Sequence, residues 1–118
     1  MKNSSDELYD TSALISACKK RSEGLRGYTT ILNVVEYPPS LALRGLRVIY
    51  PTREDYELAI RLQIRLRRIG RAVGAIDLLV ASVAVRRSLE VVTSDRDFKA
   101  IAEVEPRLRL RPIEDKRS

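Results

Sequence analysis

The sequence of 118 residues contains no histidine, no tryptophan, one cysteine and one phenylalanine. The absence of histidine excludes imidazole acid–base catalysis and histidine-ligated zinc sites. The single thiol, Cys18, forms no internal disulfide. Because no imidazole is present to activate it, we interpret it as a buried or idle side chain in a helix. Carboxylates, hydroxyls, lysines and arginines remain for chemistry, and carboxylates without histidine or cysteine favour Mg²⁺ or Mn²⁺.

Long apolar runs are also missing. No stretch approaches the roughly 18 apolar residues that a membrane span requires, and residues 1–7 contain no apolar signal core. We therefore expect a cytoplasmic protein. The length suits one domain covering residues 1–118, with loose polar tails at residues 1–7 and 112–118.

Basic residues exceed acidic ones, with 22 Lys and Arg against 16 Asp and Glu and a net charge of +6. A positive excess favours an anionic partner such as nucleic acid, although many basic proteins have no such partner. The indication gains weight if the acidic residues cluster, because a negative metal site inside a positive protein requires a particular kind of substrate.

Short hydrophobic runs alternate with helical patterns along the chain. Strands are predicted at residues 8–9, 28–32, 46–50 and 89–93, with an edge strand at 108–111. Helices are predicted at residues 13–18, 33–36, 52–69, 75–85 and 97–104. This alternation predicts an α/β domain whose parallel or mostly parallel sheet carries helices on both faces.

Polar residues mark the predicted helix starts. Thr11 or Ser12 is the expected N-cap of the first helix, and Asn33 caps the second, with Glu36 completing a capping box. The long helix that follows Thr52 should present one apolar stripe to the core, made of Leu58, Ala59, Leu62, Leu66 and Ile69. Residues 60 and 64, both isoleucine, fall outside that stripe, either as ordinary exposed side chains or as a subunit contact.

Four acidic residues lie where a predicted strand end meets a predicted helix start: Asp10, Glu36, Asp77 and Asp95. In a parallel sheet these junctions share one edge, so we expect the four carboxylates to converge. Acids near helix N-termini also have a structural explanation in capping and the helix dipole, which suits Glu36 and Asp97 when each is taken singly. Asp77 is different, because it lies in an apolar helix where an unpartnered carboxylate is costly. Clustered carboxylates repel one another unless a cation neutralises them.

Several segments together carry a resemblance: Tyr9-Asp10-Thr11-Ser12 with Leu14-Ile15, Glu36 after a strand, Ile76-Asp77-Leu78-Leu79-Val80-Ala81, and Val92-Thr93-Ser94-Asp95-Arg96-Asp97-Phe98. In this order and spacing, residues 8–110 resemble the PIN-domain family, and more narrowly the VapC-type toxins of prokaryotic toxin–antitoxin pairs. The resemblance implies a three-layer α/β/α fold with a mostly parallel central sheet. It also implies a metal-dependent endoribonuclease that cleaves RNA with Mg²⁺ or Mn²⁺, pairs with an antitoxin and forms a homodimer.

The same resemblance implies roles for individual residues. The catalytic quartet falls on Asp10, Glu36, Asp77 and Asp95. The implied metal ligands are Asp10, Asp77, Asp95 and Asp97, and the hydroxyl beside the first acid is Thr11 or Ser12. Glu36 would bind a second ion or orient the attacking water. The spacings between Asp10 and Glu36 and between Glu36 and Asp77 are shorter than is typical of the family.

Three basic residues near these motifs, Arg71, Arg96 and Lys99, are candidates to hold the phosphate backbone of a substrate. Taken singly, each is better explained as a solvated surface charge. Two other functions remain open. One is a receiver-like Mg²⁺-binding signalling domain, which would require paired acids after the first strand and a late lysine. The other is a catalytically inactive PIN-like domain that binds RNA or acts as a scaffold.

Overall fold

The computed structural model describes residues 6–21 and 24–113. In these ranges one fully parallel sheet has the strand order β3-β2-β1-β4-β5. Its strands are β1 Glu7–Tyr9, β2 Gly24–Thr30, β3 Arg44–Ile49, β4 Glu90–Val92 and β5 Arg109–Arg111. The predicted parallel sheet is confirmed, and so is the edge strand near residue 110. The order differs from the 2-1-3-4-5 arrangement of receiver-like domains, so the fold does not support that alternative.

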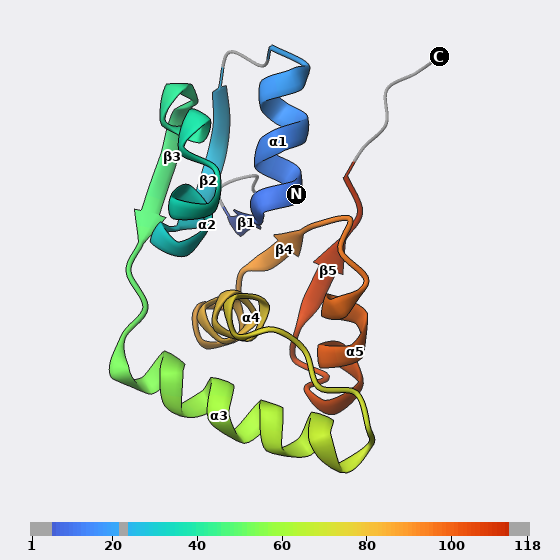
Figure 1. Ribbon diagram of the computed structural model, residues 1–118. Coiled ribbons are helices and arrows are strands. Elements are labelled where there is room, and N and C mark those ends of the chain that lie inside the picture. Colours follow the sequence, from blue (N-terminus) through green and yellow to red (C-terminus); the bar gives the residue numbers. More distant parts are fainter. Residues whose placement is uncertain (1–5, 22–23, 114–118) are drawn as a thin grey trace.

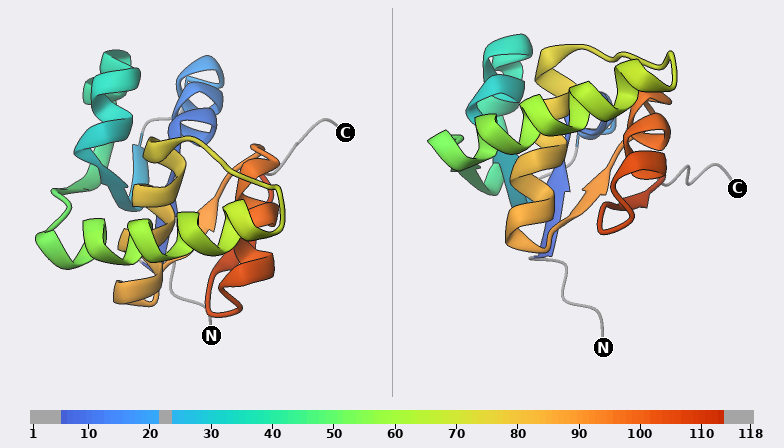
Figure 2. Two further views of the ribbon diagram at one scale, coloured as in Figure 1. Left: turned by 60° about the horizontal axis from the view of Figure 1, so that its bottom comes forward. Right: turned by 90° about the horizontal axis from the view of Figure 1, so that it is seen from below.

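Helices cover both faces of the sheet, as Figures 1 and 2 show. They are α1 Thr11–Lys19, α2 Ile31–Glu36, the 3₁₀ helix η2 Pro38–Ala42, α3 Arg53–Arg68, α4 Ala75–Arg87 and α5 Asp97–Val104. The helices α1 and η2 pack on one face, whereas α3, α4 and α5 cover the other. The predicted three-layer α/β/α fold is therefore confirmed. No helix in the described ranges has the length and apolar character to cross a membrane.

The central strand β1 positions the rest of the fold. It pairs in parallel with β2 through Leu8 and Tyr28, and with β4 through Leu8 and Val91. Because all strands run in one direction, the segments that follow β1, β2 and β4 emerge at the same edge of the sheet. That edge also receives the N-terminus of α4, as the residues lining the cleft described below show.

The larger core lies between the sheet and the layer of α3, α4 and α5. Helix α4 is buried continuously from Leu78 to Val85, as its apolar sequence predicts. Four of the five residues in the predicted α3 stripe are buried, namely Leu58, Ala59, Leu62 and Leu66. The prediction for the fifth residue of the stripe, Ile69, was wrong. Its side chain is 50% exposed, because Ile69 is the C-cap of α3 and lies beyond the last turn that packs on α4.

The N-terminal tail prediction requires a correction at Glu7. Residues 1–5 and 114–118 lie outside the described residues, but Glu7 belongs to β1 and is 2% exposed. Its carboxylate accepts a hydrogen bond of 2.8 Å from the Tyr9 hydroxyl and pairs with the Arg111 guanidinium of β5. A buried acid with such partners belongs to the core.

Two helix starts also differ from prediction. The N-cap of α1 is Asp10, whose side chain accepts from the backbone N–H of Ala13, so neither Thr11 nor Ser12 is the cap. The N-cap of α2 is Thr30, with Asn33 as the reciprocal partner in the capping box. Helix α2 therefore begins at Ile31, within the segment predicted as strand. In both helices an earlier polar residue caps the free N–H groups: Asp10 lies just before Thr11, and Thr30 lies three positions before Asn33.

Candidate active site

A cleft of about 670 Å³ opens at the edge of the sheet where the strands end. Its walls come from α1, α2, the start of α4 and the loop after β4. The four predicted acids all line it, together with hydroxyl, amide and apolar neighbours: Asp10, Thr11, Ser12, Ile15, Asn33, Glu36, Gly74, Ala75, Ile76, Asp77 and Asp95. Residues far apart in the sequence thus meet as expected from the parallel topology.

Asp10 is the most enclosed acid of the cleft, with 4% exposure. One carboxylate oxygen, Oδ1, accepts from the Ser12 hydroxyl at 2.7 Å and from the Ala13 N–H at 3.0 Å. The other, Oδ2, accepts from the Thr93 hydroxyl. Burial raises the pKa of Asp10, these three hydrogen bonds oppose the rise, and the charge of Asp95 adds to it. Donors from the start of α1 and from the residue after β4 therefore hold the Asp10 carboxylate in one orientation.

Asp77, Asp95 and Asp97 form the acidic triad. Each offers a carboxylate oxygen, and the three oxygens lie within 4.8 Å of one another. Asp77 comes from the first turn of α4, and Asp97 is the first residue of α5. Asp95 lies in the loop after β4, where its Oδ1 accepts from the Asp97 N–H at 2.9 Å and its own N–H donates to the Thr93 hydroxyl at 2.9 Å.

The electrostatics of the acidic triad are unfavourable for full ionisation. The pKa of Asp77 is raised to about 7, first by burial, and then by the charges of Asp95 and Asp97, a hydrogen bond with Asp95 and the charge of Asp10. Within the described ranges, no lysine or arginine forms an ion pair with any member of the triad. The group therefore lacks a cation of its own.

Glu36 stands apart from the acidic triad. It is exposed at the C-terminal end of α2, and its Oε1 accepts from the Thr11 hydroxyl at 2.6 Å. The Thr11 oxygen in turn accepts from the Asn33 side chain at 3.0 Å, and the Asn33 Oδ1 accepts from the Thr30 hydroxyl at 2.6 Å. This chain of hydrogen bonds fixes one Glu36 oxygen on the wall of the cleft.

Two polar residues of the site were not among the predicted site residues. Thr93 bonds both Asp10 and the Asp95 backbone, and Asn33 bonds Thr11. A hydroxyl at the last position of a strand, two residues before an acid, was the available signal for Thr93. Asn33 was predicted only as a helix cap. Among the basic candidates, Arg71 pairs with Glu103 at 3.2 Å, whereas Arg96 and Lys99 line a cavity that adjoins Asp95.

The acidic triad fits a hard divalent cation. Three carboxylates within reach of one another supply the oxygen ligands that such ions prefer. Burial and the repulsion between these carboxylates together raise the pKa of Asp77, and a bound positive charge would relieve the repulsion. Asp10 lines the same cleft and acts on the charge of Asp77, so it is placed to contribute beside the triad.

Comparison with known structures supports the same fold. VapBC2 from Rickettsia felis, bound to a DNA fragment from its promoter, matches with a TM-score of 0.75 and 19% identity over 92% of this chain and 98% of that one. DNA-bound VapBC from Salmonella typhimurium gives a TM-score of 0.74 and 22% identity over 91% and 97%. VapBC-5 from Mycobacterium tuberculosis, a member of the VapBC family of toxin–antitoxin systems, gives 0.65 and 25% over 92% and 98%.

Sequence comparison gives a narrower result. A search of curated proteins finds no significant match. The PIN-domain family matches residues 36–104, which is more than half of the chain and includes Glu36 and the whole acidic triad. With a parallel sheet of matching architecture and VapC-type structural neighbours, the chain belongs to the PIN-domain family.

Proposed function

We propose that this PIN domain is a divalent-metal-dependent endoribonuclease, the toxin of a toxin–antitoxin pair. The observation that carries the proposal is the acidic triad beside Asp10 in one open cleft, where no lysine or arginine of residues 6–21 and 24–113 forms an ion pair with the triad. If the triad had a structural role, its carboxylates would require a counter-ion from the protein, whereas in a metal site the bound metal ion neutralises them. The net charge of +6 supports RNA as the polyanionic substrate of a locally negative site.

In this proposal Asp10, Asp77 and Asp95 hold the ion, Mg²⁺ or Mn²⁺, and Asp97 adds a further carboxylate. When bound, the ion supplies Lewis-acid chemistry: it acidifies water and offsets charge on phosphate oxygens. The protein supplies orientation, because Ser12, Thr93 and the Ala13 N–H leave Asp10 no freedom to turn.

Glu36 is proposed as the acceptor of a proton from the attacking water. Its Oε1 is held by Thr11, and because the side chain is exposed, Oε2 remains open to solvent in the cleft. Alternatively, the same two carboxylate oxygens of Glu36 bind a second metal ion. Thr11 is thus a positioning residue, which acts through Glu36.

Cleavage of a labelled pool of random-sequence RNA tests the proposal. The wild type is expected to cleave with Mg²⁺ or Mn²⁺ and to stop with EDTA. Asp77→Asn keeps the shape of the side chain and should lower the rate on the order of 10³-fold, the scale of losing one essential charge-stabilising group. Glu54→Gln, an exposed acid in the first turn of α3, is the matched control and should cleave normally. A wild type that binds RNA but never cleaves it would instead support the inactive RNA-binding alternative.

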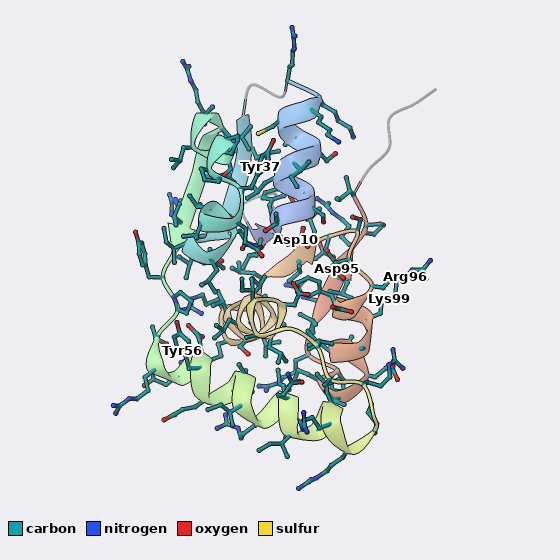
Figure 3. All side chains as sticks on the ribbon, in the orientation of Figure 1. Asp10, Tyr37, Tyr56, Asp95, Arg96 and Lys99 are labelled. Carbon is teal, nitrogen blue, oxygen red and sulfur yellow. The ribbon has the colours of Figure 1, made fainter. Side chains whose placement is uncertain are left out.

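The partner and assembly are also proposals. Because the structural neighbours are VapBC complexes, we propose a cognate antitoxin, with the protein acting in the cytoplasm. Homodimerisation is supported by an exposed apolar stripe on α3, where Tyr56 is 48%, Ile60 61% and Ile64 46% exposed at four-residue spacing. Tyr56 marks the start of this stripe in Figure 3. Sedimentation should show a dimer at tens of micromolar, converted to monomer by Ile60→Asp with Ile64→Asp; a monomeric wild type would contradict it.

A further inference from the structure

A second cavity, of about 420 Å³, adjoins the catalytic cleft. Asp95 lines both, so the Ser94–Asp95 loop is the ridge between them. The second cavity is lined by the loop after β4, the start of α5 and the end of β5: Thr93, Ser94, Asp95, Arg96, Lys99, Leu110, Arg111 and Pro112. In Figure 3, Asp95 lies between Asp10 on one side and Arg96 and Lys99 on the other.

The two spaces have opposite charge. The cleft is lined by four carboxylates and by no lysine or arginine of the described residues, whereas the lining of the adjoining cavity includes Arg96 and Lys99. Both cations are exposed, and neither forms an ion pair with a residue in the described part of the chain. The third cation, Arg111, is already paired with the buried Glu7. Arg96 and Lys99 are therefore available for an external anion.

Two other lining residues are apolar, and Thr93 and Ser94 add hydroxyl groups. Leu110 of β5 is half-buried and Pro112 follows the strand, so together they give the cavity an apolar surface below the two cations. A nucleotide combines an anionic phosphate with the apolar faces of its base, and cavities of several hundred cubic ångströms are the usual size for such ligands. An acidic peptide would satisfy the cations but would not explain why this cavity is joined to the acidic cleft.

We propose that Arg96 and Lys99 form a subsite for the nucleotide next to the scissile phosphate, so that bound RNA crosses the Asp95 ridge toward α5 and β5. The subsite rests on the proposed nuclease function, and it adds the direction in which the RNA strand leaves the catalytic cleft. Binding at a neighbouring phosphate offsets the repulsion between RNA and the carboxylates of the cleft. Arg71, the other basic candidate, does not line this cavity and pairs with Glu103 instead.

The test uses two double variants. The subsite variant carries Arg96→Ala and Lys99→Ala, and the control variant carries Arg67→Ala and Arg68→Ala. The control removes the same charge from exposed positions in the last turn of α3. With a 20-nucleotide RNA pool as substrate, the subsite variant should raise KM by about 10- to 100-fold and change kcat by less than about 3-fold. The reason is that the lost contact stabilises the bound substrate and the transition state equally. The control should stay near wild type. On a dinucleotide, which is too short to span both spaces, the difference should disappear.

Direct binding separates this inference from the nuclease proposal. In an Asp77→Asn background, fluorescence titration with the same RNA at several salt concentrations reports affinity without cleavage. Loss of two phosphate contacts should reduce the salt-dependence slope by about 1.4 for single strands. Equal weakening in the control variant, or unchanged affinity and slope in the subsite variant, would overturn the subsite. So would unchanged RNA affinity with lost affinity for a polyglutamate peptide. A wild type that never cleaves, with RNA affinity lost only in the subsite variant, would overturn the nuclease function and support the subsite as RNA-binding.

Discussion

Two partly or fully buried aspartates in this protein have opposite electrostatics. Asp55, in the first turn of α3, is fully buried, and its carboxylate accepts from Arg86 and Arg87 of α4 at 3.0 Å and from the Thr52 N–H at 2.7 Å. Burial alone would raise its pKa, but these donors hold the pKa at about 2. Asp77 is less buried, yet its pKa is about 7.

The difference lies in the charge of the neighbours. Asp55 meets two guanidinium groups, whereas Asp77 meets the carboxylates of Asp95 and Asp97. An acid that stabilises the fold brings its counter-ion from the same chain. An acid that the fold holds among other acids is costly until something outside the chain neutralises it. The contrast between these sites separates a structural acid from a candidate metal ligand.

Neutralising each acid should therefore change stability in opposite directions. Asp55→Asn leaves Arg86 and Arg87, which are partly exposed, without their charge partner and should destabilise the protein by about 1–3 kcal/mol. Asp77→Asn removes one member of a repelling group and should leave the metal-free protein as stable as the wild type or more stable. Urea melts in EDTA measure both. A destabilised Asp77→Asn that still cleaves RNA would remove Asp77 from the metal site.

A divalent ion should stabilise only the site that lacks a counter-ion. Mn²⁺ at about 100 times its Kd should raise the unfolding free energy of the wild type by about 2.7 kcal/mol. Asp77→Asn should lose most of this gain. A variant altered at the structural acid, Asp55→Asn, should keep the gain on its lower baseline. Thermal melts with and without Mn²⁺ compare the three proteins, and equal gains in all three would contradict the assignment.

The pH dependence should distinguish the sites further. Because the pKa of Asp77 is higher in the folded state than in the unfolded chain, the folded state binds more protons, and stability falls as pH rises from about 4 to 7. The wild type without metal should fall behind Asp77→Asn across this range by on the order of 4 kcal/mol, since each pH unit over which only the folded state holds the proton contributes about 1.4 kcal/mol. Asp55 has a lowered pKa, so its contribution is complete above about pH 4 and is lost as pH falls through about 2. Between pH 5 and 8, a change of the unfolding free energy with pH therefore reports on Asp77 and not on Asp55.

The smallest effect is expected at the exposed wall of the cleft. Thr11→Val removes the hydroxyl that holds Glu36 and should lower the cleavage rate by about 10-fold, the scale of one positioning hydrogen bond. If Thr11 acts through Glu36, the same substitution should have no effect in a Glu36→Gln background. A double-mutant cycle of rates measures the coupling, and additive losses would show that Thr11 acts independently.

The sequence alone determined the elements and the edge at which the acids meet. The alternation of strands and helices predicted the parallel sheet, and α5 spans Asp97–Val104 as predicted from its first-turn acid and the proline that follows. These features depend on local periodicity and on neighbours within one turn of helix, so a single sequence contains the information.

Only the tertiary structure decided which groups face each other. It gave Asp55 its two arginines from α4, placed Asp97 with Asp77 and Asp95, and joined Thr93 to Asp10. It also left Glu36 outside the acidic triad. Each of these pairings depends on strand register and helix packing between segments distant in the chain, which local patterns do not specify. The sequence therefore predicted that the acids converge, and the fold showed which of them have no ion-pair partner within residues 6–21 and 24–113.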